Sequence, residues 1–141
     1  MRLTPAIDRV LSAAMAVTFA AVGLLFLLGP DLTLRFMNRL GRGWGLAEMP
    51  LSGASFYLGL AVGYMYVVTL LAFLMFRHPH PPVFPFLLAQ AKGASSVLSF
   101  GLFVIHRPAL VFLANGVIDL SLCLLAFGLY RSRKKLERAA P

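Results

Sequence analysis

Long runs of apolar residues alternate with short polar segments along the chain. Uncharged runs of twenty-one and twenty-eight residues cover 10–30 and 49–76, and two further runs, 81–105 and 108–130, carry a single charge each. About 20 apolar residues are needed to cross the ~30 Å hydrocarbon core of a bilayer. The pattern therefore predicts an all-α polytopic membrane protein with four transmembrane helices, over about 7–29, 53–76, 83–105 and 109–130.

The connection between the first two spans carries an amphipathic pattern. Leu32, Phe36 and Leu40 recur at a spacing of four, and the opposite face is polar, with Arg35, Asn38, Arg39 and Arg42. This spacing predicts a short helix over about 31–42 that lies in the membrane interface, with Arg35, Arg39 and Trp44 as interfacial anchors. Such a helix is either a simple anchor between two spans or a lid or docking surface.

Basic residues in the flanks predict the orientation. With four spans, both termini and the turn at 77–82 share one side, which holds eight Lys and Arg residues against four on the other side. The positive-inside rule then places both termini in the cytoplasm, with a basic tail over 131–141. We expect the first span to be retained, because its apolar run is too long for a signal peptide and no polar cleavage region follows.

Composition narrows the class of protein. The chain of 141 residues is 60% hydrophobic and 13% charged, which is too apolar for a soluble domain and for a disordered chain. Cys123 is the only cysteine, so an internal disulfide is excluded. The net charge of +8 reflects the flanks and the tail. No nucleic-acid signature accompanies this charge. The basic residues are instead expected to meet the anionic cytoplasmic leaflet, either as a signal that stops and orients the last span or as a lipid-binding site.

Two charges lie inside the predicted spans. Lys92 and Asp119 stand in the third and fourth spans, where an ionised side chain costs at least ~2.5–3.5 kcal/mol and must find a partner. The short connection near 105–106 makes these spans an antiparallel hairpin. Its register brings Lys92 opposite Asp119, Gln90 opposite Ser121 and Ser96 opposite Asn115. We therefore predict an ion pair near mid-membrane.

Other polar residues are expected around this pair. Ser95, Ser96 and Ser99 follow Lys92 at helical spacing, and Asn115 precedes Asp119 by one turn. Folding back from the 77–82 turn places Tyr64 at the same depth. The predicted intramembrane polar site comprises Lys92, Asp119, Asn115, Ser96, Ser95 and Tyr64. A stripe of small residues, Ser55, Gly59 and Gly63, predicts close backbone packing of the second span.

The sequence contains no established catalytic or cofactor-binding motif. The three histidines, His78, His80 and His106, lie in connections, which argues against haem ligation within the bilayer. A redox cysteine pair, a hydrolase motif and a phosphate-binding loop are all missing from the sequence. The sequence therefore predicts no cofactor, no metal ion and no catalytic residue.

The chain resembles small bacterial four-helix inner-membrane proteins of the DoxX-like kind. The resemblance rests on the four-span layout with a longer first connection and on two strings, Ala91-Lys92-Gly93-Ala94-Ser95-Ser96 and Asn115-Gly116-Val117-Ile118-Asp119. It implies a bacterial inner-membrane location and transfers no functional motif. Small multidrug transporters have the same number of spans but rely on a glutamate in the first span, where residues 10–28 are uncharged here.

Two functions from different classes fit these observations. The first is a non-enzymatic accessory or interaction subunit, as a homo-oligomer or in a larger membrane complex, whose bundle is held together by Lys92 and Asp119. The second is a small transporter, or a membrane protein that binds a lipid, quinone or other solute, using the same polar cluster. A lipid-modifying enzyme is less favoured, because no activated nucleophile or general base stands out.

Overall fold

The structure is a computed structural model that describes residues 4–51 and 55–139, and every regular element in these ranges is a helix. The five helices are α1 (Pro5–Leu28), α2 (Pro30–Arg42), α3 (Ser55–Arg77), α4 (Val83–Ile105) and α5 (Leu110–Ala139). Four of them, α1, α3, α4 and α5, are long and apolar enough to cross a membrane. The predicted all-helical architecture with four candidate spans is therefore confirmed.

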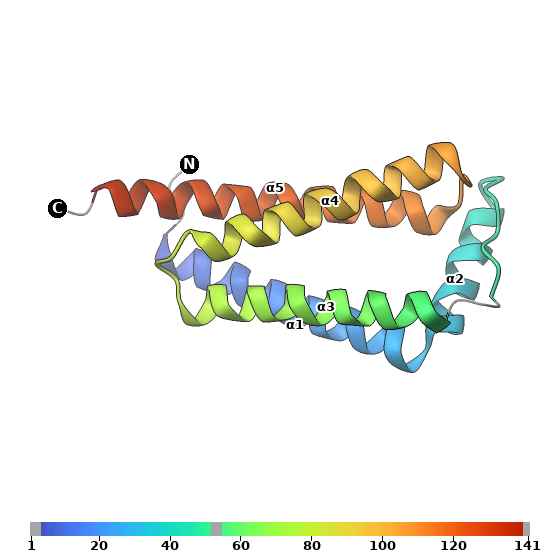
Figure 1. Ribbon diagram of the computed structural model, residues 1–141, viewed down its shortest axis with the longest axis horizontal. Helices are drawn as coiled ribbons and strands as arrows, with labels where there is room; N and C mark the ends of the chain where they lie inside the picture. The colour runs from blue at the N-terminus through green and yellow to red at the C-terminus, as the bar shows by residue number, and fades with distance from the viewer. Residues whose placement is uncertain (1–3, 52–54, 140–141) are drawn as a thin grey trace.

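The long helices form two antiparallel pairs that lie side by side. α1 packs along α3, and α4 packs along α5 (Figure 1). Both chain ends lie at one end of the bundle, and α2 crosses the opposite end at a steep angle to the long helices. The core between the pairs is built from buried apolar side chains, chiefly Met15, Phe19, Met65, Val68, Met75, Leu88 and Leu129.

Local chemistry explains where the helices begin and end. Thr4 caps α1 because its hydroxyl accepts a hydrogen bond from the Ile7 amide at 3.4 Å, and Pro5 occupies the first turn. Gly29 separates α1 from α2, and Pro30 starts α2 with no amide hydrogen to satisfy. Prolines also fill the turn between α3 and α4. These boundaries lie within two residues of the predicted ones for the first three spans.

The last helix is longer than predicted. The predicted fourth span ends at 130 and is followed by a basic tail over 131–141, whereas α5 continues to Ala139 and extends beyond the other long helices (Figure 1). Residues 131–139 contain neither glycine nor proline and are rich in lysine and arginine, both good helix formers. The helix therefore continues past the apolar run.

The first connection is held firmly against the end of the bundle. Gly41 is buried, and a Cβ built there would lie 3.2 Å from the Leu110 Cβ, so α2 packs closely on the start of α5. The Asn38 side chain donates to the Met49 carbonyl at 2.8 Å and accepts from its amide at 3.0 Å. The Ala47 amide donates to the Pro108 carbonyl at 3.1 Å. The predicted helix over 31–42 is thus present as α2.

Within the described residues, the glycines in the stripe of small residues on α3 do not pack closely against the other helices of the bundle. Gly59 and Gly63 face away from the bundle, and a Cβ at either position meets no atom within 4 Å in the described part of the chain. The side chain of Ser55, the third member of the predicted stripe, lies outside the described residues. Close approach occurs instead at Gly23, where a Cβ would lie 3.2 Å from the Met65 Cβ.

Candidate functional site

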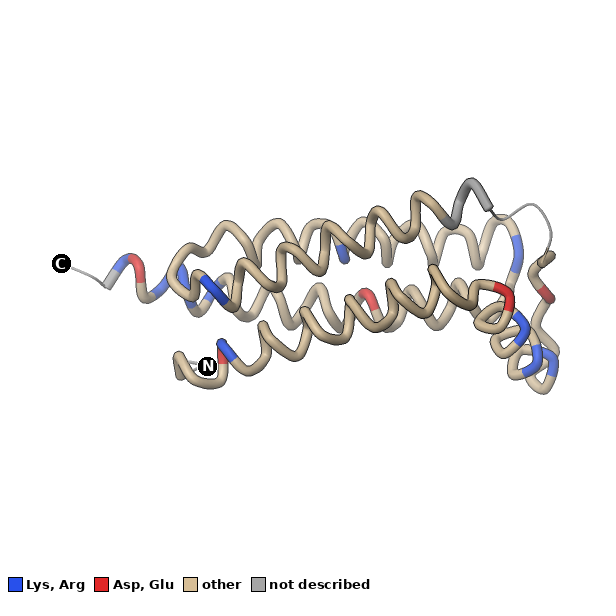
Figure 2. The backbone as a smooth tube through the Cα atoms, turned by 90° about the horizontal axis from the view of Figure 1, so that it is seen from below, with Lys and Arg blue, Asp and Glu red and all other residues tan. Residues whose placement is uncertain are grey.

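Charged positions gather at the two ends of the bundle, and the long helices between them are almost free of charge (Figure 2). Two ion pairs lie buried within the helix bundle. One joins Lys92 and Asp119 near the middle of α4, and the other joins Asp8 and Arg133 at the end where the chain termini lie. The third ion pair in the described residues, Arg42 with Glu48, is exposed in the first connection. The two buried pairs, which the helices enclose, therefore form the candidate site.

The structure joins Lys92 and Asp119 as the sequence predicts. The Lys92 ammonium donates to Asp119 Oδ1 at 2.9 Å, and each residue is only 2% exposed. The short connection after Ile105 sets this register, because it lets α4 and α5 run antiparallel from a common end. The ion pair therefore lies where neither charge reaches solvent.

Side chains from the other two long helices enclose the ammonium. Its Nζ lies 4.7 Å from the centre of the Phe19 ring of α1 and 5.1 Å from the centre of the Tyr64 ring of α3. Aromatic faces attract cations, and the attraction strengthens when the cation is desolvated. A single charge cluster thus contacts all four long helices, with Asp119 contributed by α5.

The polar residues predicted around this pair lie close to it, but some of their hydrogen-bond partners differ from the predicted ones. Ser96 donates to the Gly116 carbonyl at 2.8 Å, and the Tyr64 hydroxyl donates to the Ala91 carbonyl at 3.1 Å. Asn115 donates to the Ser99 hydroxyl at 2.7 Å and to the Ser95 hydroxyl at 3.4 Å, so the expected pairing of Ser96 with Asn115 is wrong. Every polar residue predicted for this site therefore lies in the α4–α5 seam or beside it.

One carboxylate oxygen of the cluster has no hydrogen-bond donor in the part of the chain that the structure describes. Asp119 Oδ2 is buried and accepts no hydrogen bond within the described residues. A buried carboxylate oxygen without a donor costs free energy, and natural structures seldom leave one. Among the described residues it is the one buried side-chain nitrogen or oxygen atom without a hydrogen-bond partner.

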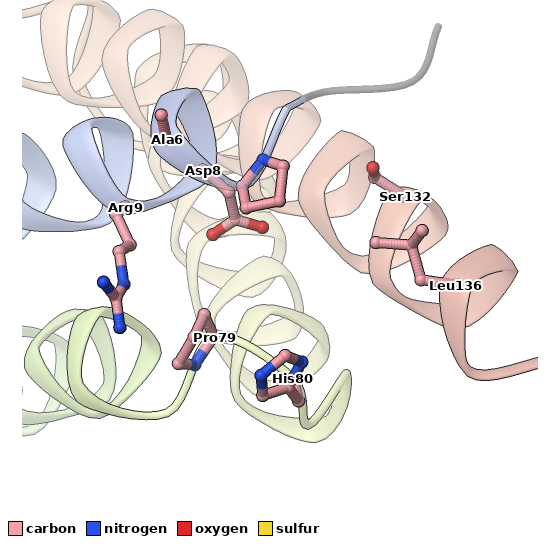
Figure 3. Close-up of a pocket in the computed structure, with 8 residues that line it drawn as sticks. Ala6, Asp8, Arg9, Pro79, His80, Ser132 and Leu136 are labelled. Atoms are coloured by element: carbon pink, nitrogen blue, oxygen red, sulfur yellow. The ribbon is translucent and has the colours of Figure 1, made fainter. Parts of the chain in front are cut away.

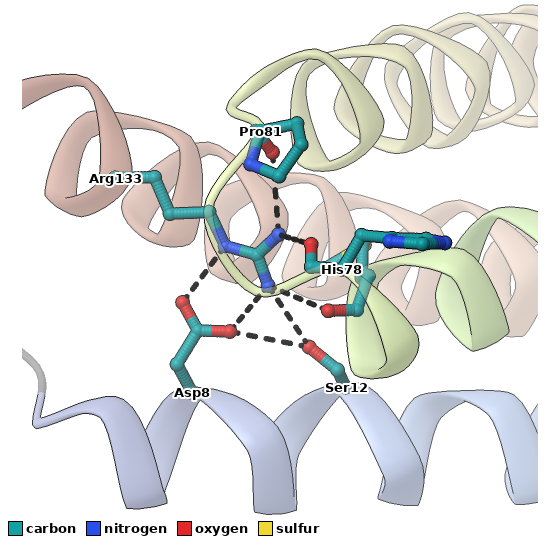
Figure 4. Close-up of polar contacts among 6 residues, drawn as sticks. Asp8, Ser12, His78, Pro81 and Arg133 are labelled. Atoms are coloured by element: carbon teal, nitrogen blue, oxygen red, sulfur yellow. Dashed lines mark hydrogen bonds and ion pairs between the residues drawn. The ribbon is translucent and has the colours of Figure 1, made fainter. Parts of the chain in front are cut away.

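The second pair centres on Arg133, whose side chain is 1% exposed (Figure 4). Its Nε donates to Asp8 Oδ2 at 2.9 Å and its Nη2 donates to Asp8 Oδ1, which makes a two-pronged contact. Ser12, one turn after Asp8, donates to Asp8 Oδ1 at 3.3 Å. These contacts tie α5 to α1, two helices that otherwise touch little.

Arg133 also closes the end of α3. Its remaining N–H groups donate to the backbone carbonyls of Met75 at 3.1 Å, His78 at 3.2 Å and Pro81 at 3.3 Å. Helix C-termini leave carbonyls without amide partners, and a cation there is favourable. One guanidinium therefore satisfies the end of α3, the turn after it and a carboxylate of α1.

Sequence reasoning missed this second centre. Two signals were available: Asp8 and Ser12 share one helix face, and a protein with four spans brings the ends of its first and last spans together. Neither signal alone selects Arg133 from the basic residues that surround it at 131–138. The predicted inward position of Asp119 does, because Arg133 follows it by fourteen residues and so lies on nearly the same face of α5.

A cavity of about 530 Å³ lies beside the Asp8–Arg133 pair. Its lining combines the start of α1, the turn after α3 and the far end of α5, with Arg9, His80 and Leu136 among the side chains (Figure 3). Arg35, Arg39 and Trp44, predicted as interfacial anchors, lie at the opposite end of the bundle and are exposed. The structure does not bring them to either ion pair.

Comparison of the chain with protein-family models, curated proteins and solved structures finds no match in any of the three. Within the described residues, three or more His, Cys, Asp or Glu side chains do not gather in a metal-binding arrangement. Among the described residues, the candidate site therefore rests on the two buried ion pairs and on the cavity that Asp8 lines.

Proposed function

We propose that this chain is a small, non-enzymatic integral protein of the bacterial inner membrane, related to DoxX-like proteins, that acts as an accessory or interaction subunit. It assembles with a second copy or within a larger membrane complex, and both termini are cytoplasmic. The four long helices support the membrane location, because their outward faces are apolar along most of their length. The excess of basic residues at the end with both termini supports the orientation.

The enclosure of Lys92 carries the proposal. A transport or binding residue needs access to its ligand, whereas the Lys92 ammonium already contacts Asp119, Phe19 and Tyr64. An ion pair that contacts every long helix fixes their depth and rotation relative to one another. The pair therefore acts as an internal tie, and the outer surface of the bundle is left to meet partners.

A candidate partner surface lies on α3. Gly59 and Gly63 form a Gly-x-x-x-Gly pattern on an outward face, and no atom of the described residues lies within 4 Å of a Cβ built at either position. In membranes such a pattern lets another helix approach closely, which gains packing contacts and weak backbone hydrogen bonds. This face suits a helix from a second copy or from a different membrane protein.

The position of α2 in the membrane interface belongs to the same proposal. Leu32, Phe36 and Leu40 are exposed, so the apolar stripe of α2 faces away from the bundle rather than into it. Arg35 and Arg39 are exposed on the polar side, and Trp44 follows at 71% exposure. An apolar stripe without a protein partner is satisfied when the helix lies in the headgroup region.

Native mass spectrometry in a mild detergent tests the proposal. We expect the wild-type protein to run as a homo-oligomer or with a co-purifying membrane protein. Gly63→Leu should abolish this association, because leucine fills the open face. Gly101→Leu is the matched control: its site on α4 is also open, and the variant should assemble normally. A protein that is monomeric and without a protein partner would contradict the proposal.

One observation favours a second function, a small transporter or a solute-binding membrane protein. Asp119 Oδ2 accepts no hydrogen bond in the described residues, and a small donor such as an ammonium group or a hydroxyl would satisfy it. Under this function the same mass spectra show a stoichiometric small molecule that Asp119→Asn removes. Under the subunit function Asp119→Asn changes stability and releases nothing.

A further inference from the structure

A groove of about 500 Å³ lies between α1 and α5. Its inner part is apolar, with Ile7 and Leu11 from α1 and Leu124 and Leu125 from α5. Its outer part is polar, with Arg131, Ser132 and Lys135 at the end where the chain termini lie. From these features we propose that the groove binds one anionic phospholipid, with acyl chain along the apolar part and phosphate between Arg131 and Lys135.

The groove exists because α1 and α5 do not pack along their length. The Asp8–Arg133 pair holds them together at one end, and their further contacts are few. The positions on α5 that face the seam, 124, 128, 131 and 135, repeat at helical spacing and so form one face. Gly128 lies in the middle of this face without a side chain, which deepens the groove.

The charges at the outer part are available to a ligand. Neither Arg131 nor Lys135 forms an ion pair with any of the residues that the structure describes. The Arg131 guanidinium lies over the Phe127 ring, 4.8 Å from its centre, which steadies its position and leaves its N–H groups free to donate. The acidic residues at this end are turned elsewhere: Asp8 binds Arg133, and Glu137 lines a separate cavity with Pro79–Pro82.

The order of apolar and basic residues matches a phospholipid. Along α5 the groove passes from leucines to an open glycine and then to two cations, as a lipid passes from acyl chain to phosphate. Basic pockets between transmembrane helices at the membrane surface are a recurring way to bind anionic headgroups. The proposal depends on the membrane location proposed above and does not depend on the partner surface of α3.

Lipid binding to the purified protein in detergent, measured by native mass spectrometry, tests the inference. The probes are phosphatidylglycerol and phosphatidylcholine of the same chain length. We expect phosphatidylglycerol to bind about 30-fold more tightly, which is about 2 kcal/mol at about 1 kcal/mol per basic residue. The double variant R131Q/K135Q should lose this preference.

Two further variants separate the groove from a diffuse basic surface. The double variant K134Q/R138Q removes the same charge from the same helix at positions outside the groove, so the lipid preference should persist. Gly128→Leu has open space above it, so it should fold normally and weaken the binding of both lipids. Equal losses in the two double variants, or unchanged binding in Gly128→Leu, would overturn the inference. If the protein fractionates with membranes and assembles but shows no preference between the two lipids, the lipid-binding inference is wrong while the proposed function stands.

Discussion

Replacing Arg133 with methionine should destabilise the protein by about 3–5 kcal/mol, the range expected when one partner of a buried ion pair is removed. The substitution keeps an unbranched apolar stem and removes all five N–H donors. Asp8 then retains only the Ser12 hydroxyl at 3.3 Å. The carbonyls of Met75, His78 and Pro81 lose their side-chain donor as well.

SDS titration in mixed micelles, followed by circular dichroism, measures this free energy of unfolding. Arg138→Met is the matched control, because Arg138 is exposed on the same helix and should change stability by less than about 1 kcal/mol. The double variant D8L/R133M should be more stable than R133M alone, since it removes the uncompensated carboxylate. If R133M unfolds within about 1 kcal/mol of the wild type, the role assigned to Arg133 is wrong.

Three more predictions concern other parts of the chain. Gly116→Ala should cost about 1–3 kcal/mol in the same titration, because the new Cβ would lie 2.9 Å from the Phe100 ring, whereas Gly59→Ala should be tolerated; equal stability of the two would contradict this packing. Asn38→Ala removes both hydrogen bonds to Met49, so proteolysis between 43 and 51 should accelerate while the long helices stay protected, and an unchanged cleavage rate would refute it. Trp44 is the only tryptophan, so its fluorescence in vesicles should be quenched more by a shallow lipid spin label than by a deep one; the reverse order would exclude the interfacial position.

The four helices and the Lys92–Asp119 pair were predictable because short-range constraints determine them. Charge-free runs define the spans, and the tight connection after Ile105 determines which positions of α4 and α5 share a depth. The partner of Asn115 could not be predicted from depth alone. Helical side chains tilt toward the N-terminus of their own helix, so Asn115 reaches toward the connection and meets Ser99 instead of Ser96.

Lys92 and Asp119 indicate the inward faces of α4 and α5, but the inward face of α3 was not predictable in the same way. α3 is apolar on every side, and because lipid is as apolar as a protein core, the pattern does not reveal which face turns inward. Gly59 and Gly63 therefore point outward against expectation. Arg133 was missed for a different reason: it lies on nearly the same face of α5 as Asp119, fourteen residues later, but beyond residue 130, where the predicted span ends.

The central claim is that Lys92 and Asp119 tie the bundle together, and a charge exchange tests it most directly. The single variants Lys92→Asp and Asp119→Lys should each lose about 3–5 kcal/mol in SDS titration, because each leaves two like charges buried together. The exchanged double variant should recover at least half of the worse loss, though not all, since a carboxylate beside the Phe19 and Tyr64 rings lacks the attraction that the ammonium has. A double variant no more stable than the worse single variant would contradict the account.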